Sequence, residues 1–462
     1  MKITLASLTF SLIILCCNPS SAQTNTINYS WKAGVSSVKI TPSEAMPMAG
    51  FASRTHSSEG MLHDIWAKAL IIEDSKGKRA VMISSDLLGF PKIMSDPIRD
   101  RIKAQYGLGR DQILLNSSHT HSGPVIGDAL TDVYLLDNQQ VASVINYSKK
   151  LEDQIVKLVG DAIKNMEPVE LYAQNGVTRF QVNRRNNSAN LLTQLTELQG
   201  PNDFAVPVLK AVTAKGDLKA IAFGYACHPT VLSGYDWSGD YPGYAQIELE
   251  KDHPGTTALF FQSSGADQGP FPGNTVPLAK QYGRELAAAV DRVLEEEMRK
   301  LPSNLITSYS ELDLPLASSP TEAELTKIVN NTGGIAYQKR WAQRFLNKIK
   351  AGEKLITSYP YPVQVWSIGN LPLVSLGGEL LVEYGIKIKQ MLGEDTFVYG
   401  YSNDVMSYVP SSIVLKEGGY EGELSHTAVY GLPSKWQVGV ESRILNEVLK
   451  LAEKNGQIKN SK

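Results

Sequence analysis

The residues of this chain whose types and spacing best suit metal binding or catalysis are two histidines separated by a single residue, His119 and His121. They follow the apolar run Ile113–Leu115 and precede Gly123-Pro124, so they lie where a buried strand is expected to end. On an extended backbone, side chains two residues apart point to the same face. The spacing therefore predicts two imidazoles that project together, either as metal ligands or as ordinary hydrogen-bonded histidines.

Other polar and ionisable residues also follow directly on apolar segments of strand length. These runs are Asn116-Ser117-Ser118-His119, Ala226-Cys227-His228-Pro229-Thr230, Gln262-Ser263-Ser264-Gly265-Ala266-Asp267, Gly377-Gly378-Glu379 and Tyr401-Ser402-Asn403-Asp404. In sheet-based enzymes, ligands bind at the carboxyl ends of strands and in the loops that follow. Two imidazoles and a carboxylate with an open position form a catalytic zinc pattern, in which the metal lowers the pKa of bound water to about 7. The sequence therefore predicts a metal-assisted hydrolytic site at these strand ends.

The elements that must position these residues are strands alternating with helices. Strand-length apolar segments are Ala69–Ile72, Ala80–Ser84, Ile113–Leu115, Ala220–Tyr225, Ala258–Phe261, Leu373–Leu376 and Phe397–Tyr399. Helical periodicity is found over Ile93–Tyr106, Val144–Met166, Ala279–Met298 and Ala336–Ile349. The turns Lys215-Gly216-Asp217 and Gly369-Asn370 favour antiparallel hairpins. We therefore expect an α/β (α+β) fold with mixed β-sheets flanked by helices, in a single large catalytic domain.

Composition excludes some classes of protein. The net charge is −2 and the basic residues are scattered, so a surface that binds nucleic acid is not indicated. With 462 residues and 42% hydrophobic content, the chain is long enough to bury a large core.

The N-terminal segment predicts export to the periplasm or out of the cell. Lys2 precedes a largely apolar run from Ile3 to Cys17, and small residues stand at Ser20 and Ala22, so we expect a signal peptide at 1–22. Lipoprotein anchoring at Cys16 or Cys17 is less favoured, because neither cysteine follows a small residue. After this cleavage Cys227 would be the single cysteine. No later segment of the sequence is long and apolar enough to span a membrane.

We place the remaining boundaries by composition. A linker is expected at 23–30, the hydrolase domain at 31–452 and a polar tail at 453–462.

At this point the motifs resemble those of the neutral/alkaline (non-lysosomal) ceramidases, from about Trp31 to Arg443. The runs that carry the resemblance are Ser118-His119-Thr120-His121-Ser122-Gly123-Pro124, Asn183-Arg184, His228-Pro229-Thr230, Asp240 with Gly243-Tyr244-Ala245, Gly378-Glu379, Ser402-Asn403 with Tyr408, and Tyr420-Glu421. One such run is weak evidence, but their combination is specific.

The resemblance implies one zinc ion per chain and a set of residues around it. It implies that His119, His228, Glu379 and Tyr408 hold the zinc. It also implies that His121 and Arg184 contact the scissile group or its developing oxyanion, with zinc-activated water as the attacking group. We add Asp267 as a carboxylate that orients a ligand histidine.

Three departures from the family pattern bear on the activity. Where ceramidases have a serine proposed to act in amide cleavage, this chain has Gly269 in the run Ala266-Asp267-Gln268-Gly269-Pro270. Val405 replaces the first tyrosine of the last zinc motif, and the chain ends where ceramidases continue into an immunoglobulin-like domain. A covalent serine mechanism is therefore disfavoured. Hydrolysis by zinc-activated water needs no such serine and stays possible.

Three functions remain open at this stage. The first is an exported zinc-dependent amidohydrolase that cleaves the N-acyl amide of ceramide or a related lipid, with a place in sphingolipid metabolism and peripheral contact with a membrane surface. The second keeps the zinc scaffold but cleaves another amide, ester or glycan-linked group. The third is a non-catalytic protein that binds lipid or glycan at its surface.

Overall fold

The computed structural model describes residues 31–188, 191 and 197–458. The expected signal peptide, the cysteine pair Cys16-Cys17 and the linker at 23–30 lie outside these residues. Within the described part, no helix combines the length and apolar character needed to cross a membrane.

The part of the chain from Trp31 to Lys300 contributes the strands of a nine-stranded mixed sheet. Its order is β11-β9-β8-β6-β1-β3-β4-β5, with β13 beside β6. The bounds are β1 Trp31–Lys39, β3 Trp66–Glu73, β4 Arg79–Ser85, β5 Ile113–Leu115, β6 Glu167–Val177, β8 Ala205–Thr213, β9 Leu218–Tyr225, β11 Thr257–Gln262 and β13 Arg299–Lys300. The parallel pairs β4/β5 and β9/β11 each bring the carboxyl ends of their own two strands together.

A second, four-stranded sheet has the order β14-β15-β16-β18. Its strands are β14 Leu305–Pro315, β15 Ser358–Ile368, β16 Leu371–Leu376 and β18 Phe397–Tyr399. Short two-stranded pairs join β2 Gly60–Met61 to β10 Asp236–Trp237, β7 Gln181–Asn183 to β12 Gln268–Pro270, and β17 Glu379–Leu380 to β19 Tyr408–Val409. The last pair sets Glu379 beside Tyr408 in register.

Helices α1 to α4 pack on the first sheet and α7 and α9 on the second. The bounds of the helices are α1 Lys92–Tyr106, α2 Asn138–Lys164, α3 Asp240–Asp252, α4 Val276–Glu295, α5 Glu322–Asn330, α6 Ala336–Lys350, α7 Val382–Leu392, α8 Ser412–Glu417 and α9 Val440–Lys454. A 3₁₀ turn spans Arg110–Gln112 and a π-helix spans Tyr420–Val429. Capping boxes begin two of the helices, Asp137 with Gln140 at α2 and Thr321 with Glu324 at α5.

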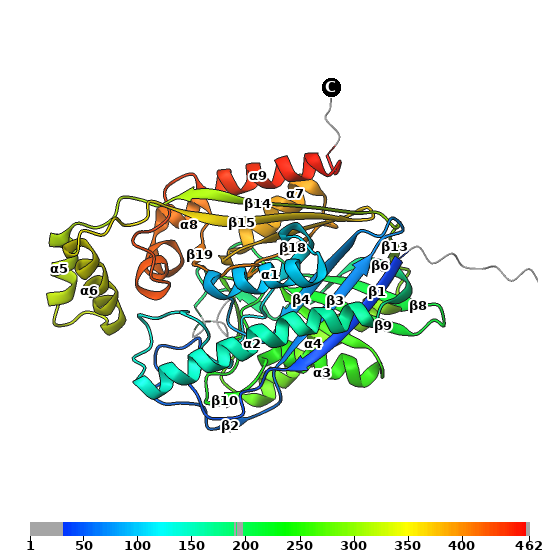
Figure 1. Cartoon of the computed structure of the whole chain (residues 1–462), viewed down its shortest axis with the longest axis horizontal. Helices are drawn as coiled ribbons and strands as arrows, with labels where there is room; N and C mark the ends of the chain where they lie inside the picture. Colours follow the sequence, from blue (N-terminus) through cyan, green and yellow to red (C-terminus); the bar gives the residue numbers. More distant parts are fainter. Residues whose placement is uncertain (1–30, 189–190, 192–196, 459–462) are drawn as a thin grey trace, which may run out of the picture.

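The layers follow from the alternation of side chains along the strands. On β3, Leu70 and Ile72 face the second sheet, while Ala69 and Ile71 face α1 and α2. On β9 and β11, Phe223 and Phe260 face α3 and α4. The second sheet packs its outer face on α7 and α9. The result is a helix–sheet–sheet–helix arrangement, visible in Figure 1 from α9 at the top to α3 at the bottom.

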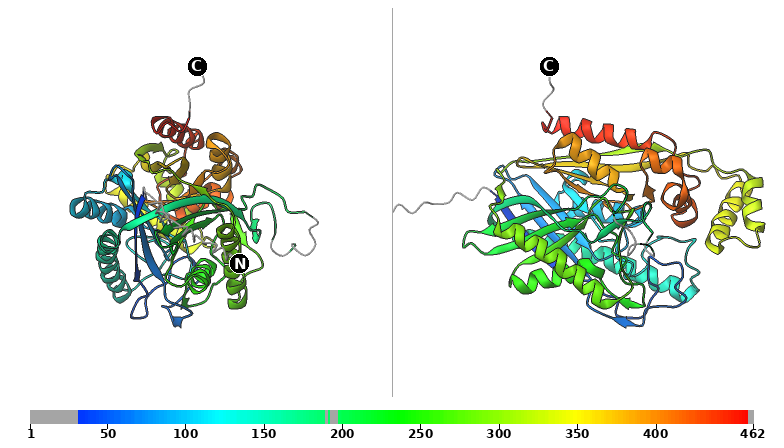
Figure 2. Two further views of the ribbon diagram at one scale, coloured as in Figure 1. Left: turned by 90° about the vertical axis from the view of Figure 1, so that its right-hand side faces the viewer. Right: turned by 180° about the vertical axis from the view of Figure 1, so that it is seen from behind.

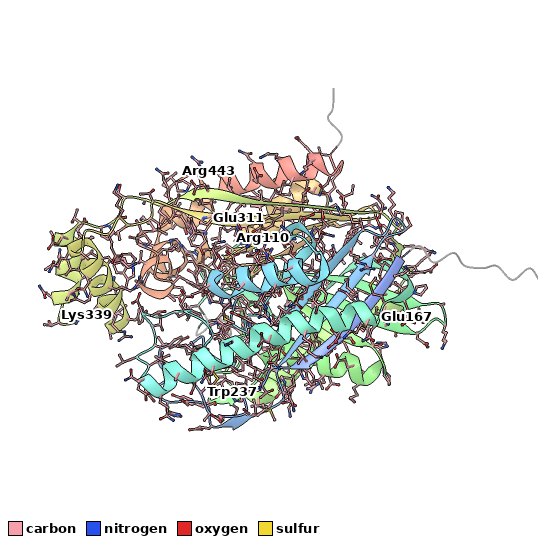
Figure 3. All side chains as sticks on the ribbon, in the orientation of Figure 1. Arg110, Glu167, Trp237, Glu311, Lys339 and Arg443 are labelled. Atoms are coloured by element: carbon pink, nitrogen blue, oxygen red, sulfur yellow. The ribbon has the colours of Figure 1, made fainter. Side chains whose placement is uncertain are left out.

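Polar contacts at the edge reinforce the packing of the two sheets. Arg110, in the 3₁₀ turn before β5, lies beside Glu311 of β14, as their labels show in Figure 3. The Nη1 atom of Arg110 is 3.4 Å from Oε1 of Glu311. Trp366 of β15 donates its indole N–H to the carbonyl oxygen of Asp111 in the same turn.

The hairpin of α5 and α6 stands away from the layers, at one end of the molecule (Figures 1 and 2). It has a small apolar core of its own, built on Leu325, Trp341 and Phe345. Trp341 and Arg344 tie it to the chain just after the π-helix, through the carbonyl oxygens of Leu432 and Gly431.

The expected fold class is confirmed. Each strand predicted from periodicity lies within an observed strand, and both predicted hairpin turns join antiparallel pairs, β8/β9 and β15/β16. The predicted helices at Val144–Met166 and Ala279–Met298 run two and three residues past the observed ends of α2 and α4. The described part of the expected tail at 453–462 is packed, since Asn455 and Gln457 donate to the carbonyl oxygens of Val365 and Trp366.

Candidate metal centre

The strand ends that the sequence placed together do meet in space. Asn116, after β5, donates its side-chain amide to the carbonyl oxygen of Gly400 after β18, and its own side-chain oxygen accepts from the backbone of Gln262 at the end of β11. This buried asparagine joins three strand ends at a single point. The loops that follow carry His119, Asp267 and Tyr401.

Two histidines and one glutamate converge in this region. The Oε2 atom of Glu379 lies 3.1 Å from Nε2 of His119 and 3.2 Å from Nε2 of His228. All three side chains are buried, with 1%, 0% and 3% of the residue surface exposed for His119, His228 and Glu379. They come from positions far apart in the chain, so the cluster exists only in the folded protein.

Hydrogen bonds on the far side of each imidazole fix which ring nitrogen faces the cluster. The Nδ1 atoms of His119 and His228 donate to the carbonyl oxygens of Leu88, at 2.6 Å, and Gly265, at 3.1 Å. A carbonyl oxygen can only accept, so each Nδ1 carries the proton and each Nε2 presents a lone pair. Two lone pairs and a carboxylate oxygen therefore point at one another.

The donor set fits a divalent cation. Three acceptors within about hydrogen-bond distance repel one another unless a cation or a proton lies among them. Among the residues that the structure describes, none donates a hydrogen bond to Oε2 of Glu379. The ligand atoms of His119, His121 and His228 also lie within 4.8 Å of one another, close enough to share an ion. Imidazole nitrogens with a carboxylate are the ligands typical of catalytic zinc.

Burial keeps the imidazoles of His121 and His228 in the neutral form that binds metals. Desolvation, followed by the charge of Arg184, lowers the pKa of His228 to about 4. Desolvation, followed by the neighbouring His119 and His228, holds the pKa of His121 well below its usual value. Both rings are therefore neutral at physiological pH.

Tyr408 and Arg184 lie at the edge of the cluster. The hydroxyl of Tyr408 is 3.4 Å from Nε2 of His228, and it accepts a hydrogen bond from Nη2 of Arg184 at 3.0 Å. Nε of Arg184 donates to Oε1 of Glu421, also at 3.0 Å. Burial lowers the pKa of Arg184, but Tyr408 and Glu421 outweigh this effect and place it well above its ordinary value. The guanidinium is therefore a permanent cation beside the cluster.

His121 has one nitrogen at the cluster and one without a partner. Its Nε2 atom is 3.3 Å from Nε2 of His119, whereas its buried Nδ1 makes no hydrogen bond with any residue that the structure describes. The ring of Phe51 packs against it at a centroid distance of 4.8 Å. Gly50 approaches so closely that a Cβ atom there would lie 2.5 Å from Cγ of His121.

The backbone corrects our reason for the pairing of the two histidines. We expected an extended chain through the pair, but His119 has φ = 65°, in the left-handed region, and lies beyond the end of β5. Non-glycine residues rarely adopt this conformation, and they gather at functional sites. Tyr401, with φ = 49°, shares this conformation, and its ring centroid lies 4.5 Å from that of His119.

Asp267 has a different role from the one we expected. The imidazoles of His119 and His228 are oriented by backbone carbonyls, whereas the Asp267 carboxylate accepts from the backbone N–H of Val382 and the side-chain amide of Asn183. Its carbonyl oxygen accepts from the backbone N–H of Arg184. Because these bonds reach both Arg184 and Val382, Asp267 connects the backbone that carries Arg184 to the start of α7. Its carboxylate is occupied by these donors and does not orient a histidine.

Two further residues of the centre had no role in our reading of the sequence. The Tyr430 hydroxyl donates to Oε1 of Glu379 at 2.5 Å, and the Glu421 carboxylate holds both Arg184 and Arg185. Glu421 was visible only as part of a motif. Nothing in the local pattern around Tyr430 marked it, since its partner lies 51 residues away.

The family model and the similar proteins found by comparison all belong to the ceramidases. The model of the neutral/alkaline non-lysosomal ceramidase N-terminal domain matches residues 31–274. The neutral ceramidase of Pseudomonas aeruginosa is 23% identical, over 85% of this chain and 68% of that protein. The neutral ceramidase of Drosophila melanogaster is 24% identical, over 49% of this chain and 33% of that protein.

Solved structures show the same fold. The crystal structure of neutral ceramidase from Pseudomonas aeruginosa superposes with a TM-score of 0.70 and 22% identity, covering 92% of this chain and 75% of that one. A ceramidase complexed with C2 gives the same TM-score at 20% identity, covering 93% of this chain and 76% of that one. The family model matches more than half of the chain, and the motif residues meet in one buried cluster. The chain therefore belongs to the neutral/alkaline non-lysosomal ceramidase family.

Proposed function

We propose that this protein is an exported, zinc-dependent amidohydrolase that cleaves the N-acyl amide bond of ceramide or a related lipid. The observation that carries the proposal is the convergence of Nε2 of His119, Nε2 of His228 and Oε2 of Glu379. Membership of the family and the names of its matched relatives support the substrate class. Export rests on the N-terminal sequence alone.

His119, His228, Glu379 and Tyr408 would hold one zinc ion. When bound, such an ion supplies Lewis acidity and lowers the pKa of water at neutral pH. The tautomers of His119 and His228 are already set for this role by the carbonyl oxygens of Leu88 and Gly265. No rearrangement of the two rings is needed before binding, which favours affinity.

Arg184 and His121 act on the substrate. Arg184 is a fixed cation, since Glu421 and Tyr408 orient its guanidinium, so it is placed to stabilise the negative charge that develops on the amide oxygen. His121 is neutral and its Nδ1 has no partner within residues 31–188, 191 and 197–458, so it has a nitrogen available for the scissile group. Phe51 and Gly50 leave its ring little freedom to turn away.

A cavity beside the centre suits an apolar part of the substrate. It has a volume of about 1030 Å³ and lies between the α5–α6 hairpin and the π-helix. Ile328, Trp341, Leu424 and Tyr420 are among its lining residues. The Tyr420 ring contacts Tyr408 at a centroid distance of 5.4 Å, so one end of the cavity adjoins the proposed ligands. The proposal assigns this cavity to a lipid chain of the substrate.

Gly269 favours a second candidate, hydrolysis of a different amide or an ester on the same scaffold. A Cβ atom at Gly269 would lie 3.1 Å from the Phe271 ring, so an aromatic side chain crowds the position at which the family has a serine. The wall of the site therefore differs from the family pattern at this point. Substrate preference is the property that this difference would change.

The test is zinc content together with hydrolysis of a fluorescent N-acylsphingosine by the purified protein, before and after chelation. We expect one zinc per chain and release of fatty acid that stops on chelation and returns with zinc. His119→Ala and His228→Ala should lose zinc and lower kcat/KM by about a thousandfold or more. His253→Ala is the matched control, since His253 pairs with Asp291 outside the centre.

Each other outcome has a clear meaning. Bound zinc without release of fatty acid favours the second candidate, which a panel of other amides and esters then tests. Full activity in His119→Ala or His228→Ala contradicts the zinc mechanism. Absence of both zinc and hydrolysis favours a non-catalytic binding protein.

A further inference from the structure

Tyr430 makes a direct contact with the proposed metal ligand Glu379. It lies at the C-terminal end of the π-helix Tyr420–Val429, and its hydroxyl donates to Oε1 of Glu379 at 2.5 Å. The other carboxylate oxygen, Oε2, faces the Nε2 atoms of His119 and His228 and accepts no hydrogen bond from any residue in the described part of the chain. The two oxygens of one carboxylate are therefore in different environments.

This asymmetry determines how the carboxylate is presented. A free glutamate side chain can turn about its last bond and exchange the two oxygens, or offer both at once. With Oε1 held by a hydroxyl donor, a turn would break a buried charge-assisted hydrogen bond, which is among the stronger kinds. Glu379 is thus fixed with one oxygen directed at the imidazoles.

The backbone around Tyr430 is itself held in place. The α5–α6 hairpin fixes the two residues that follow, since Arg344 donates to the carbonyl oxygen of Gly431 and the indole N–H of Trp341 donates to that of Leu432. Arg344 is anchored in turn by the carboxylate of Asp132.

The ring of Tyr430 is also constrained. It packs against the apolar cluster around Val405, Tyr408 and Leu381. The packing therefore fixes the position of its hydroxyl. A residue that orients another side chain must itself be held in this way.

We propose that Tyr430 is a positioning residue for Glu379, which fixes this carboxylate as a one-oxygen ligand and so raises the affinity of the site for its metal. The α5–α6 hairpin contributes by holding the chain on which Tyr430 stands. The inference rests on the proposed function, because it takes Glu379 as a metal ligand. It concerns the affinity for the metal, so it can be measured without any substrate.

The test compares Tyr430→Phe with Tyr147→Phe in the full chain. Tyr147 is a matched control, because it is also partly buried and its hydroxyl also makes one hydrogen bond, to the carbonyl oxygen of Ile40, which is not one of the proposed metal ligands. Zinc affinity is measured by competition with a chromogenic chelator, and the midpoint of thermal unfolding is measured for the zinc-free proteins.

We expect Tyr430→Phe to bind zinc about 10- to 100-fold more weakly than the wild type, as removal of a hydrogen bond to a ligand commonly does. Tyr147→Phe should bind zinc with wild-type affinity. In saturating zinc, Tyr430→Phe should recover most of its kcat with an unchanged KM. A purely structural role would instead lower the zinc-free unfolding temperature and leave the affinity unchanged.

Wild-type zinc affinity in Tyr430→Phe overturns the inference. Weaker zinc binding in both variants overturns it as well, since the effect would then follow from the loss of any buried hydroxyl. If the wild type binds zinc but hydrolyses no N-acyl lipid, the proposed function fails while the ratio of affinities still decides the role of Tyr430. A wild type that binds no zinc overturns both.

Discussion

Glu421 holds the guanidinium of Arg184 against the hydroxyl of Tyr408. The Nε atom of Arg184 donates to Oε1 of Glu421 and its Nη2 atom donates to Tyr408, both at 3.0 Å. Glu421 is buried, and its second oxygen accepts from Arg185 at 2.8 Å. The direction of Arg184 is therefore set by a carboxylate that contacts neither the imidazoles nor Glu379.

Glu421→Gln should lower kcat/KM by about 10- to 100-fold, because Arg184 loses its charged partner and the orientation that it provides. Glu417→Gln is the control, since Glu417 pairs with Arg185 at an exposed position. Steady-state kinetics on an N-acylsphingosine measures both. Equal activities for the two variants would show that Arg184 does not depend on Glu421.

Gly50→Ala should impair catalysis through His121. A Cβ atom at this position would lie 2.5 Å from Cγ of His121, so the imidazole must shift, and a displacement of about 1 Å can cost about a hundredfold in rate. Gly77→Ala is matched in backbone strain, since Gly50 and Gly77 have φ = 105° and 80°, but nothing lies within 4 Å of its Cβ.

Both alanine variants should lose about 1–2 kcal/mol of unfolding free energy from the left-handed conformation. Only Gly50→Ala should lose kcat. Denaturant unfolding and kinetics together separate the two effects. Similar kcat values in both variants would mean that the site tolerates movement of His121.

Removal of the metal should destabilise the protein. Without a cation, the acceptor atoms of His119, His228 and Glu379 face one another, and a ligand present at 100 times its Kd adds about 2.7 kcal/mol to folding stability. We expect chelation to lower the midpoint of thermal unfolding and zinc to restore it. The unfolding temperature of His228→Ala should not respond to either treatment, and a similar response in that variant would place the metal elsewhere.

Asp404→Asn should change how stability depends on pH. Burial raises the pKa of Asp404 to about 7, against the effect of a hydrogen bond from Tyr359. The folded protein therefore holds a proton that the unfolded chain releases near pH 4, so the stability contributed by this carboxyl is complete below pH 4 and is lost as the pH rises through 7.

Asparagine keeps an acceptor for Tyr359 and has no charge to bury. The unfolding temperature of Asp404→Asn relative to the wild type should rise by several degrees between pH 5 and pH 8. Thermal unfolding across this range measures the difference. A constant difference would mean that Asp404 is already ionised in the folded protein at pH 5.

Local sequence was enough for the elements with strong periodicity. The apolar run Ala80–Ser84 and the helical pattern Ile93–Tyr106 lie within β4 and α1, because a strand or helix that buries one face repeats its apolar residues with a fixed period. Local sequence did not predict strands β1 and β6 or the π-helix. The π-helix is rare and has a different hydrogen-bond spacing, so the usual periods do not detect it.

The sequence by itself determined the chemistry that is available. Its motifs identified His119, His228, Glu379, Tyr408 and Arg184 as the groups around one centre, and the folded chain brings all five together. His119, His228 and Glu379 belong to polar runs that follow apolar segments of strand length, so local sequence marked them as candidates. Tyr408 and Arg184 were identified through the resemblance to the family alone.

Only the tertiary structure decided how these groups are oriented. The left-handed backbone at His119, the anchoring role of Asp267 and the bond from Tyr430 to Glu379 depend on partners distant in sequence. Such contacts leave no periodic trace in the chain, because their energy is gained only when the packed layers bring the partners together. Residue types set what the centre can bind, and packing sets the direction in which each atom points.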